Sequence, residues 1–298
     1  MSKSAFRDYA PGEVIGNGER AYVVEERIAR GKFGVVFACR DHWGQPRILR
    51  VVWPFSRAYE NVRETWAQQA AELQRSQHPN LVHVLDSFEH DGCFHLVLER
   101  CDYRLDRFIV SPAWDGGRWL KAVARPVLCA LEHLHAAGYT HKNLHPQNIF
   151  CSIHLERLHP DSVFSGAIKL GDLDVNTLLG NVDVLNVKLP RGLVPPEYLN
   201  PSECGPMDHR VDIYQAGLLL LCVLLGRITH YSFEEISTGL PVKTAERLES
   251  SYGQVVARAL QLKVADRFQS ALELWQSLSG SQPAVPADCE LQVLDERR

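Results

Sequence analysis

Short apolar runs divide the first hundred residues into strand-like segments. Three of these runs are rich in β-branched and aromatic residues and are bounded by Gly or Asp, as β-strands commonly are; they lie at 21–28, 35–40 and 47–53. The stretches between them, ARGKFG and DHWGQP, suit hairpin connections. A helical pattern over 59–77 ends before Pro79, because proline cannot continue a helix. Two more strands are expected at 81–91 and 93–99, which gives five strands and one helix in this part of the chain.

After residue 102 the pattern becomes mainly helical. Hydrophobic residues recur at helical spacing over 119–138, where Gly138 provides a C-terminal stop. Further helices are expected at 210–227, 245–260 and 268–279. The most apolar segment, 216–226, is shorter than the roughly 20 residues that cross a bilayer. We therefore expect a helix buried on all sides and no membrane span.

The order of these elements predicts an α+β fold with two lobes. A length of 298 residues suits one large domain or two lobes that share a cleft. We expect a loose N-terminal extension, a small β-rich lobe with one helix, a larger mainly helical lobe and a Pro-rich charged tail, at 1–20, 21–102, 103–280 and 281–298.

Composition narrows the class of protein. Hydrophobic residues make up 45% and charged residues 23%, which is ordinary for a globular protein. The formal charge of −4 gives no electrostatic case for binding nucleic acid or anionic lipid. The N-terminal residues lack the apolar run of a signal peptide. Eight cysteines without a C-x-x-C pair suggest reduced thiols, so we expect a cytoplasmic protein.

One cluster suggests a metal and needs weighing. Cys151, His154 and His159 lie close together in the sequence, but a fourth ligand and the paired spacing of zinc sites are missing. An ordinary polar loop is therefore the favoured interpretation of this stretch.

Six short motifs follow one another along the chain. They are IARGKFGVVFA, RILRVV, HLVLERC, HKNLHPQN, IKLGDLDV and a closing set of PPEYL, DIYQAG and DRFQSALEL. Their order and spacing resemble those of a eukaryotic-type protein kinase domain, of the kind also found in bacteria, over roughly residues 22–280. The resemblance implies a bilobal protein-kinase-like fold with ATP held between the lobes.

The resemblance implies a nucleotide pocket in the first lobe. Its phosphate-covering hairpin would contain three matching residues, Gly31, Gly34 and Val36, although Ala29 replaces the first glycine of the motif. Leu98 would flank the adenine, and backbone groups of Glu99 and Cys101 would meet the base. Taken alone, IARGKFGVVFA is typical of a plain β-turn. HLVLERC, taken alone, is typical of any apolar strand followed by a polar turn.

The residue that would contact the α- and β-phosphates departs from the family pattern. Arg50 occupies the lysine position of the motif V-A-I-K, and an arginine is not interchangeable with a lysine at such a site. The helix glutamate that pairs with this lysine falls on Gln69, which is neutral. Glu72, one turn later, is a partial substitute.

The catalytic loop departs from the pattern at two positions. Asn143 replaces the aspartate that accepts the substrate proton, and His145 replaces the lysine that faces the transferred phosphoryl group. An amide cannot take a proton at neutral pH, and an unperturbed histidine is mostly neutral there. Both changes predict impaired chemistry.

The two metal-binding positions of the family are kept. The resemblance places Mg²⁺ or Mn²⁺ on Asn148 and Asp172, whose oxygens suit these cations. Asp174 replaces the glycine of the motif D-F-G and could add a carboxylate or repel phosphate. The stretch between Asn148 and Asp172 is longer than the family's hairpin needs, and Thr177 is the one hydroxyl residue between Asp172 and Glu197.

The closing motifs have scaffold roles in the family. We expect Glu197 to pair with Arg267, and Asp212 to hold the backbone of the catalytic loop. Their presence predicts that the fold is retained even where the chemical residues have changed.

Three functions follow from this pattern. The first is a pseudokinase that could hold nucleotide and metal and that acts as a regulatory or scaffolding protein through contacts with a protein partner. The alternative is a weakly active or unconventional ATP-dependent Ser/Thr protein kinase, because positioning alone supplies much of phosphoryl transfer. A purely structural fold with an empty pocket is the third, and the retained Asn148 and Asp172 count against it.

Overall fold

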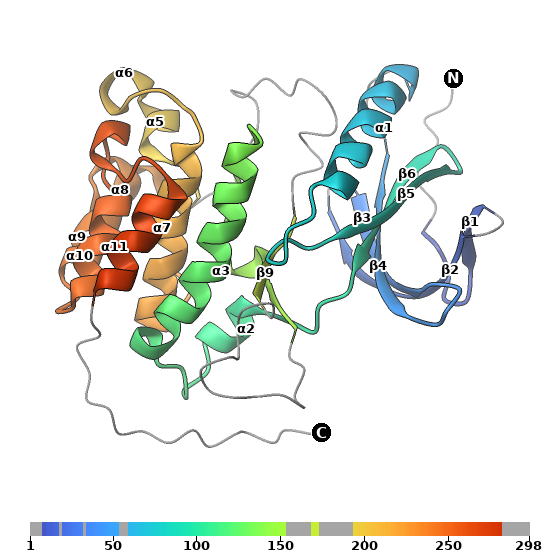
Figure 1. Cartoon of the computed structure of the whole chain (residues 1–298), viewed down its shortest axis with the longest axis horizontal. Helices are drawn as coiled ribbons and strands as arrows, with labels where there is room; N and C mark the ends of the chain where they lie inside the picture. Colours follow the sequence, from blue (N-terminus) through green and yellow to red (C-terminus); the bar gives the residue numbers. More distant parts are fainter. Residues whose placement is uncertain are drawn as a thin grey trace.

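The chain folds into two lobes of different composition, seen in a computed structural model (Figure 1). The structure describes residues 8–17, 20–31, 34–53, 59–152, 168–172 and 193–281. One lobe is a curled sheet with a single long helix, and the other is mainly helical. This is the predicted bilobal α+β arrangement. No helix in the described ranges is long and apolar enough to cross a membrane.

The smaller lobe is built on an antiparallel sheet of six strands in the order β1-β2-β3-β4-β6-β5. The strands are β1 (Val14–Asn17), β2 (Arg20–Arg30), β3 (Gly34–Arg40), β4 (Pro46–Val52), β5 (Val84–His90) and β6 (Cys93–Glu99). Helix α1 (Tyr59–Arg75) packs on one face, where the Trp66 ring lies 5.1 Å from that of Phe94. The opposite face buries Val35 and Phe37 in a separate core, because successive strand residues point to opposite faces.

The expected loose extension up to residue 20 is wrong for its second half. Residues Val14–Asn17 form β1, which pairs with β2, and Ile15 is fully buried. Tyr9 is also buried, and its hydroxyl lies 2.8 Å from His95 Nε2. The strand has four residues and one of them is Gly16, so its sequence lacks a strong strand signal. Gly16 adopts a φ of 124°, a conformation that favours glycine.

The larger lobe begins with a small sheet under the cleft. Strands β7 (Tyr103–Arg104), β8 (Ile149–Cys151) and β9 (Ile168–Leu170) form it, in that order. The helices are α2 (Leu105–Ile109), α3 (Gly116–Ala136), α5 (Pro196–Leu199), α6 (Pro201–Cys204), α7 (Arg210–Leu225), α8 (Phe233–Ser237), α9 (Leu240–Glu246), α10 (Ser251–Ala259) and α11 (Ala271–Gly280), with short 3₁₀ turns η1 (Pro146–Asn148) and η3 (Val264–Asp266).

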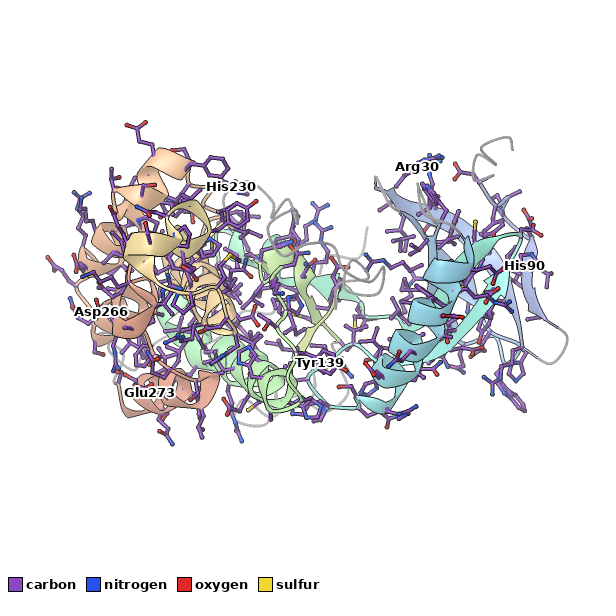
Figure 2. All side chains as sticks on the ribbon, turned by 90° about the horizontal axis from the view of Figure 1, so that it is seen from above. Arg30, His90, Tyr139, His230, Asp266 and Glu273 are labelled. Carbon is purple, nitrogen blue, oxygen red and sulfur yellow. The ribbon has the colours of Figure 1, made fainter. Side chains whose placement is uncertain are left out.

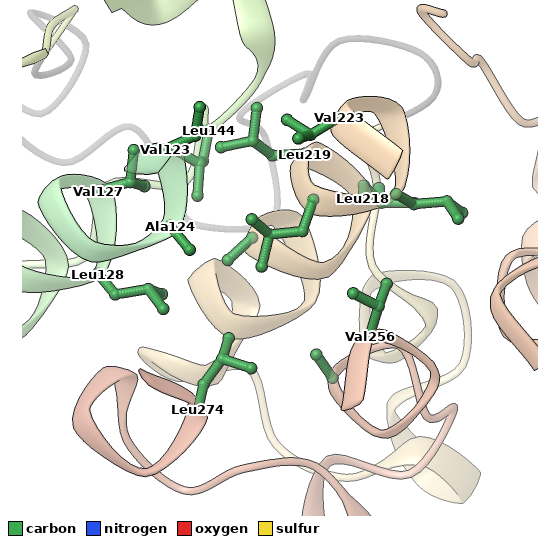
Figure 3. Packing of buried hydrophobic residues seen from close by; sticks show 14 of the residues in the cluster. Val123, Ala124, Val127, Leu128, Leu144, Leu218, Leu219, Val223, Val256 and Leu274 are labelled. Atoms are coloured by element: carbon green, nitrogen blue, oxygen red, sulfur yellow. The ribbon is translucent and has the colours of Figure 1, made fainter. Parts of the chain in front are cut away.

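Helix α7 forms the centre of this lobe. Its residues from Val211 to Val223 are all buried, and α3, α10 and α11 surround it, as Figure 3 shows for the side chains around Leu219. The prediction of a helix buried on all sides is confirmed. The helix ends where Gly226 adopts a left-handed φ of 62°, a conformation that favours glycine.

The single helix expected at 245–260 is two helices. α9 ends at Glu246, and α10 starts after Ser250, whose side chain accepts a hydrogen bond from the Gly253 backbone. A serine that caps the next helix explains the break, because its hydroxyl satisfies a backbone N–H that has no partner within the helix.

Candidate functional site

The candidate site lies where the two lobes meet, and a buried carboxylate fixes its backbone. Asp212, on α7, is fully buried and accepts hydrogen bonds of 2.7 Å from the backbone N–H groups of both His141 and Lys142. Lys142 has a φ of 61°, which is uncommon for a residue other than glycine. The expectation that Asp212 holds the catalytic loop is therefore confirmed.

The loop is tied in turn to the segment that carries Asp172. His141 is buried, and its Nε2 lies 3.0 Å from the carbonyl oxygen of Gly171. The Gly171 backbone also donates to the Asn148 carbonyl at 2.9 Å. A Cβ at Gly171 would lie 2.7 Å from the Phe150 ring, so only glycine fits between these neighbours. Asp172 follows with a φ of 57°, a second left-handed residue held by this network.

Three nitrogen donors converge on the Asp172 carboxylate. The Arg50 guanidinium forms an ion pair with it, Asn143 Nδ2 donates to it at 3.1 Å, and Asn148 Nδ2 lies 3.4 Å away. Burial is the largest influence and by itself would raise the pKa of Asp172. The charge and hydrogen bond of Arg50, with smaller contributions from His141 and His145, together outweigh burial, so the pKa lies below its ordinary value. Asp172 is therefore held as a carboxylate by the protein itself.

This arrangement differs from the one expected for a metal. A divalent cation needs oxygen atoms directed at one point, whereas Asn148 and Asn143 direct N–H donors at Asp172. The Asn143 side-chain oxygen is buried and has no hydrogen-bond partner. Within the described residues, no group of three His, Cys, Asp or Glu side chains could hold a metal. The residue types suit Mg²⁺ or Mn²⁺, but as placed they do not fit such an ion.

The two altered catalytic-loop residues provide neither the carboxylate of the family's loop nor its positive charge. Asn143 presents an amide, and the carboxylate that the described hydrogen bonds bring to it is Asp172, already paired with Arg50. His145 is partly buried, and burial lowers its pKa to about 4, so the ring is neutral at pH 7. Its Nδ1 accepts a hydrogen bond from the Gln147 backbone at 3.3 Å.

The substitute proposed for the missing helix glutamate is wrong. Glu72 accepts a 2.5 Å hydrogen bond from the hydroxyl of Tyr139, and Arg50 is paired with Asp172 instead. The side chain of Gln69 lies outside the described residues. The same is true of Leu173, Asp174, Thr177, His154 and His159.

The expected nucleotide-binding residues lie on both sides of the Arg50 strand. Gly31 and Gly34 close the β2–β3 turn through a 2.9 Å backbone hydrogen bond, and Val36 is directly opposite Arg50 in the sheet. A Cβ at Gly34 would lie 2.5 Å from the Val51 carbonyl oxygen. Behind Arg50, a small cavity is lined by Leu73, Val82, Val84, Leu96, Leu98 and Asp172.

The segment that joins the lobes carries a contact that the motifs did not indicate. Lys169 Nζ, on β9, lies 2.8 Å from the carboxylate of Glu99 on β6, and that carboxylate also accepts from the His83 backbone at 2.8 Å. The Glu99 N–H donates to the His83 carbonyl, so it is already engaged. Cys101 follows, and burial raises its thiol pKa to about 11. The sequence signal for this contact was a lysine within the buried apolar strand β9, because a buried lysine is almost always paired.

Comparison with known proteins identifies the scaffold. The family model described as the protein kinase domain matches residues 22–276. Serine/threonine-protein kinase pkn3 of Myxococcus xanthus is 28% identical over 269 residues, which cover 84% of this chain and 48% of pkn3. Serine/threonine-protein kinase 36 of Mus musculus is 27% identical over 240 residues, 78% of this chain and 17% of that protein. The chain thus spans about half or less of the length of these relatives.

Solved structures support the same fold. The kinase domain of Mycobacterium tuberculosis PknI superposes with a TM-score of 0.63 at 20% identity, covering 91% of this chain and 99% of that one. The structure of Rad53 1-466 in complex with AMP-PNP gives 0.65 at 18% identity, covering 86% and 64% of the two chains. At these identities the likeness concerns the fold.

Proposed function

Because this chain belongs to the protein kinase domain family, we propose that it holds ATP between its lobes and acts as a pseudokinase. In this proposal its phosphoryl transfer is strongly impaired, and it works as a regulatory or scaffolding protein through contacts with a protein partner. In other words, the chain would retain the nucleotide site of the family and would lack its efficient phosphoryl transfer.

The Asn143 side chain carries this proposal. A substrate hydroxyl is activated when a neighbouring group accepts its proton, and such general base catalysis contributes about 10²–10⁴ in rate. Asn143 offers an amide, and Asp172, its carboxylate neighbour at 3.1 Å, is neutralised by Arg50. Neutral His145 adds no charge to stabilise a transferring phosphoryl group.

A slow Ser/Thr protein kinase is the second candidate. Both relatives described above are named as serine/threonine-protein kinases, and these names favour this candidate, whereas the geometry at Asn143 favours the first. The buried pair of Glu197 and Arg267, at 2.9 Å, also gives the chain the family's intact scaffold. For this candidate to operate, Arg50 would have to leave Asp172 so that the carboxylate could act in catalysis.

Phosphoryl transfer from radiolabelled ATP to a generic acceptor protein separates the two. For the pseudokinase we expect a wild-type rate at background. The double variant Asn143→Asp with His145→Lys should be about 10²-fold faster or more, because it restores the base and the charge. Asn200→Asp makes the same amide-to-carboxylate change on the surface and should remain at background. A clear wild-type rate that Asp172→Ala abolishes would establish the second candidate instead.

A further inference from the structure

The ion pair between Arg50 and Asp172 occupies the position where a protein kinase would bring a divalent cation to its carboxylate. Both side chains are partly buried, with exposed fractions of 24% and 30%. One side of the pair faces a cavity whose other lining residues are all apolar: Leu73, Val82, Val84, Leu96 and Leu98. Low local polarity strengthens the attraction between opposite charges.

A guanidinium can bind a carboxylate and a phosphate at the same time. It has five N–H donors, and the contact with Asp172 is made by one terminal nitrogen. An ammonium has three donors on a single nitrogen, so it acts as a point charge. Arginine at position 50 therefore leaves donors for phosphate oxygens after it has neutralised Asp172.

The charge balance around Asp172 disfavours a divalent cation. Asn143 stands where the family has an aspartate. In the described part of the cleft, the carboxylate beside the catalytic loop is therefore Asp172, and Arg50 cancels its charge. An incoming cation would meet two amide N–H donors and a guanidinium. Mg²⁺ sheds water reluctantly and is normally held by one or two available carboxylates, which this arrangement does not supply.

We propose that Arg50 supplies, from within the chain, the positive charge that a divalent cation would otherwise place beside Asp172. The cleft then binds nucleoside di- and triphosphates in their metal-free form. Arg50 is the residue that determines this preference, because it pairs with Asp172 and offers its remaining donors to the phosphates. This inference rests on the proposed function, since it assumes that nucleotide enters the cleft.

Titration calorimetry with ATP and with ADP tests the proposal directly. Each titration is carried out on the full chain in EDTA and again in excess MgCl₂ or MnCl₂. We expect the wild type to bind in EDTA at least as tightly as with either metal. Binding that requires Mg²⁺ or Mn²⁺ would overturn the inference while leaving nucleotide binding in place. Absence of binding under every condition would overturn both this inference and the proposed nucleotide site.

Two variants identify the residue responsible. Arg50→Lys should weaken metal-free binding at least about tenfold, as expected for the loss of a hydrogen bond to a charged group, and metal should then improve binding. Asp172→Asn should keep or strengthen metal-free binding, because it releases Arg50 toward the phosphates. A cleft that depends on a metal would lose binding in Asp172→Asn, so the two outcomes have opposite sign.

A matched control is available on the same strand. Arg47 lies three positions before Arg50 and so points to the opposite face of the sheet; it has an exposed fraction of 27% and pairs with Asp41 at 2.9 Å. Arg47→Lys should leave binding unchanged in EDTA and in metal. Thermal unfolding of each variant checks that it is folded, and an equal loss of binding in Arg47→Lys and Arg50→Lys would refute the specific role of Arg50.

Discussion

Asn143 alters the site in two ways through one amide group. It removes the proton acceptor of the loop, and it directs an N–H donor at Asp172 from 3.1 Å. A carboxylate in the same place would lie beside Asp172 as a like charge and would raise the pKa of one of the two groups. The loss of the base and the stabilisation of a charged Asp172 beside Arg50 therefore have the same origin.

A single buried histidine should make the stability of the smaller lobe depend on pH. His95 is fully buried between Phe88, whose ring stacks 4.9 Å away, and Tyr9. Burial, with a smaller contribution from His90, lowers its pKa to about 4. The unfolded chain, with a pKa near 6.5, binds more protons between these values, so the free energy of unfolding should fall as pH drops from about 6.5 to 4.

The expected loss attributable to His95 is about 2 kcal/mol between pH 8 and pH 5. Urea unfolding at both pH values measures it. His95→Phe should flatten this part of the pH dependence, whereas His42→Phe, at an exposed position, should leave it unchanged. A pH dependence identical in wild type and His95→Phe would contradict the assignment.

The sequence identified the site residues by position but not by partner. The gapless loop HKNLHPQN located Asn143, His145 and Asn148, because motif spacing is a property of the chain alone. It could not predict that Arg50 pairs with Asp172 or that Glu72 pairs with Tyr139. Those partners depend on how α1 and β4 lie against the larger lobe, and no local pattern contains that information.

Among the elements, α3 and α7 approach each other closely where α3 begins and α7 ends. Gly116 opens α3, and a Cβ there would lie 2.3 Å from the Val223 carbonyl oxygen and 2.7 Å from Leu224. Trp114, just before α3, donates its indole N–H to the same carbonyl at 2.8 Å. The end of the central helix is thus fixed by close backbone approach as well as by apolar packing.

Two adjacent glycines should respond to alanine with opposite sign. Gly116→Ala forces the backbone of α7 to move and should lower the free energy of unfolding by about 1–3 kcal/mol. A Cβ at Gly117 would contact the Asp115 side chain alone, at 3.5 Å. Gly117→Ala should therefore raise the free energy of unfolding by about 0.4–1 kcal/mol, because alanine favours helix. Urea denaturation of the two variants tests this; equal effects would show that the contact is not tight.

Element types were predictable where their patterns were long. The strands from residue 20 to 52 and the central helix follow from β-branched runs and from a continuous apolar segment. β1 was missed because four residues with a glycine among them give little pattern. The break at Ser250 was missed because a cap and an interior serine look alike in a sequence.

At the scale of the whole molecule, the two lobes are held together by backbone hydrogen bonds as well as by side-chain contacts. Leu170 of β9 donates to the Asn80 carbonyl at 2.8 Å and accepts from the Val82 N–H at 2.9 Å. Lys169 adds its ion pair with Glu99 and a hydrogen bond to the Leu81 carbonyl. On the side where Tyr139 meets α1, the lobes approach again (Figure 2). The cleft is therefore closed at its back by fixed contacts.

Removing the charge of Lys169 should loosen this junction. Lys169→Met would leave the partly buried Glu99 carboxylate without its ion partner, and we expect a loss of about 1.5–3 kcal/mol in the free energy of unfolding. Lys263→Met, at an exposed lysine, serves as the control and should change stability by less than about 0.5 kcal/mol. Calorimetric unfolding of both variants measures the difference; no loss in Lys169→Met would show that the pair is dispensable.

The first strand has a practical bearing on where this domain is cut. The family match starts at residue 22, in the middle of the β1–β2 pairing, yet Tyr9 and Ile15 belong to the same apolar core as Phe37. A recombinant fragment trimmed to the match would expose apolar surface to solvent. It would also leave the edge of β2 unpaired, so that other chains could pair with it. Expression should therefore begin upstream of Asp8, whose carboxylate forms ion pairs with both Arg27 and Arg30.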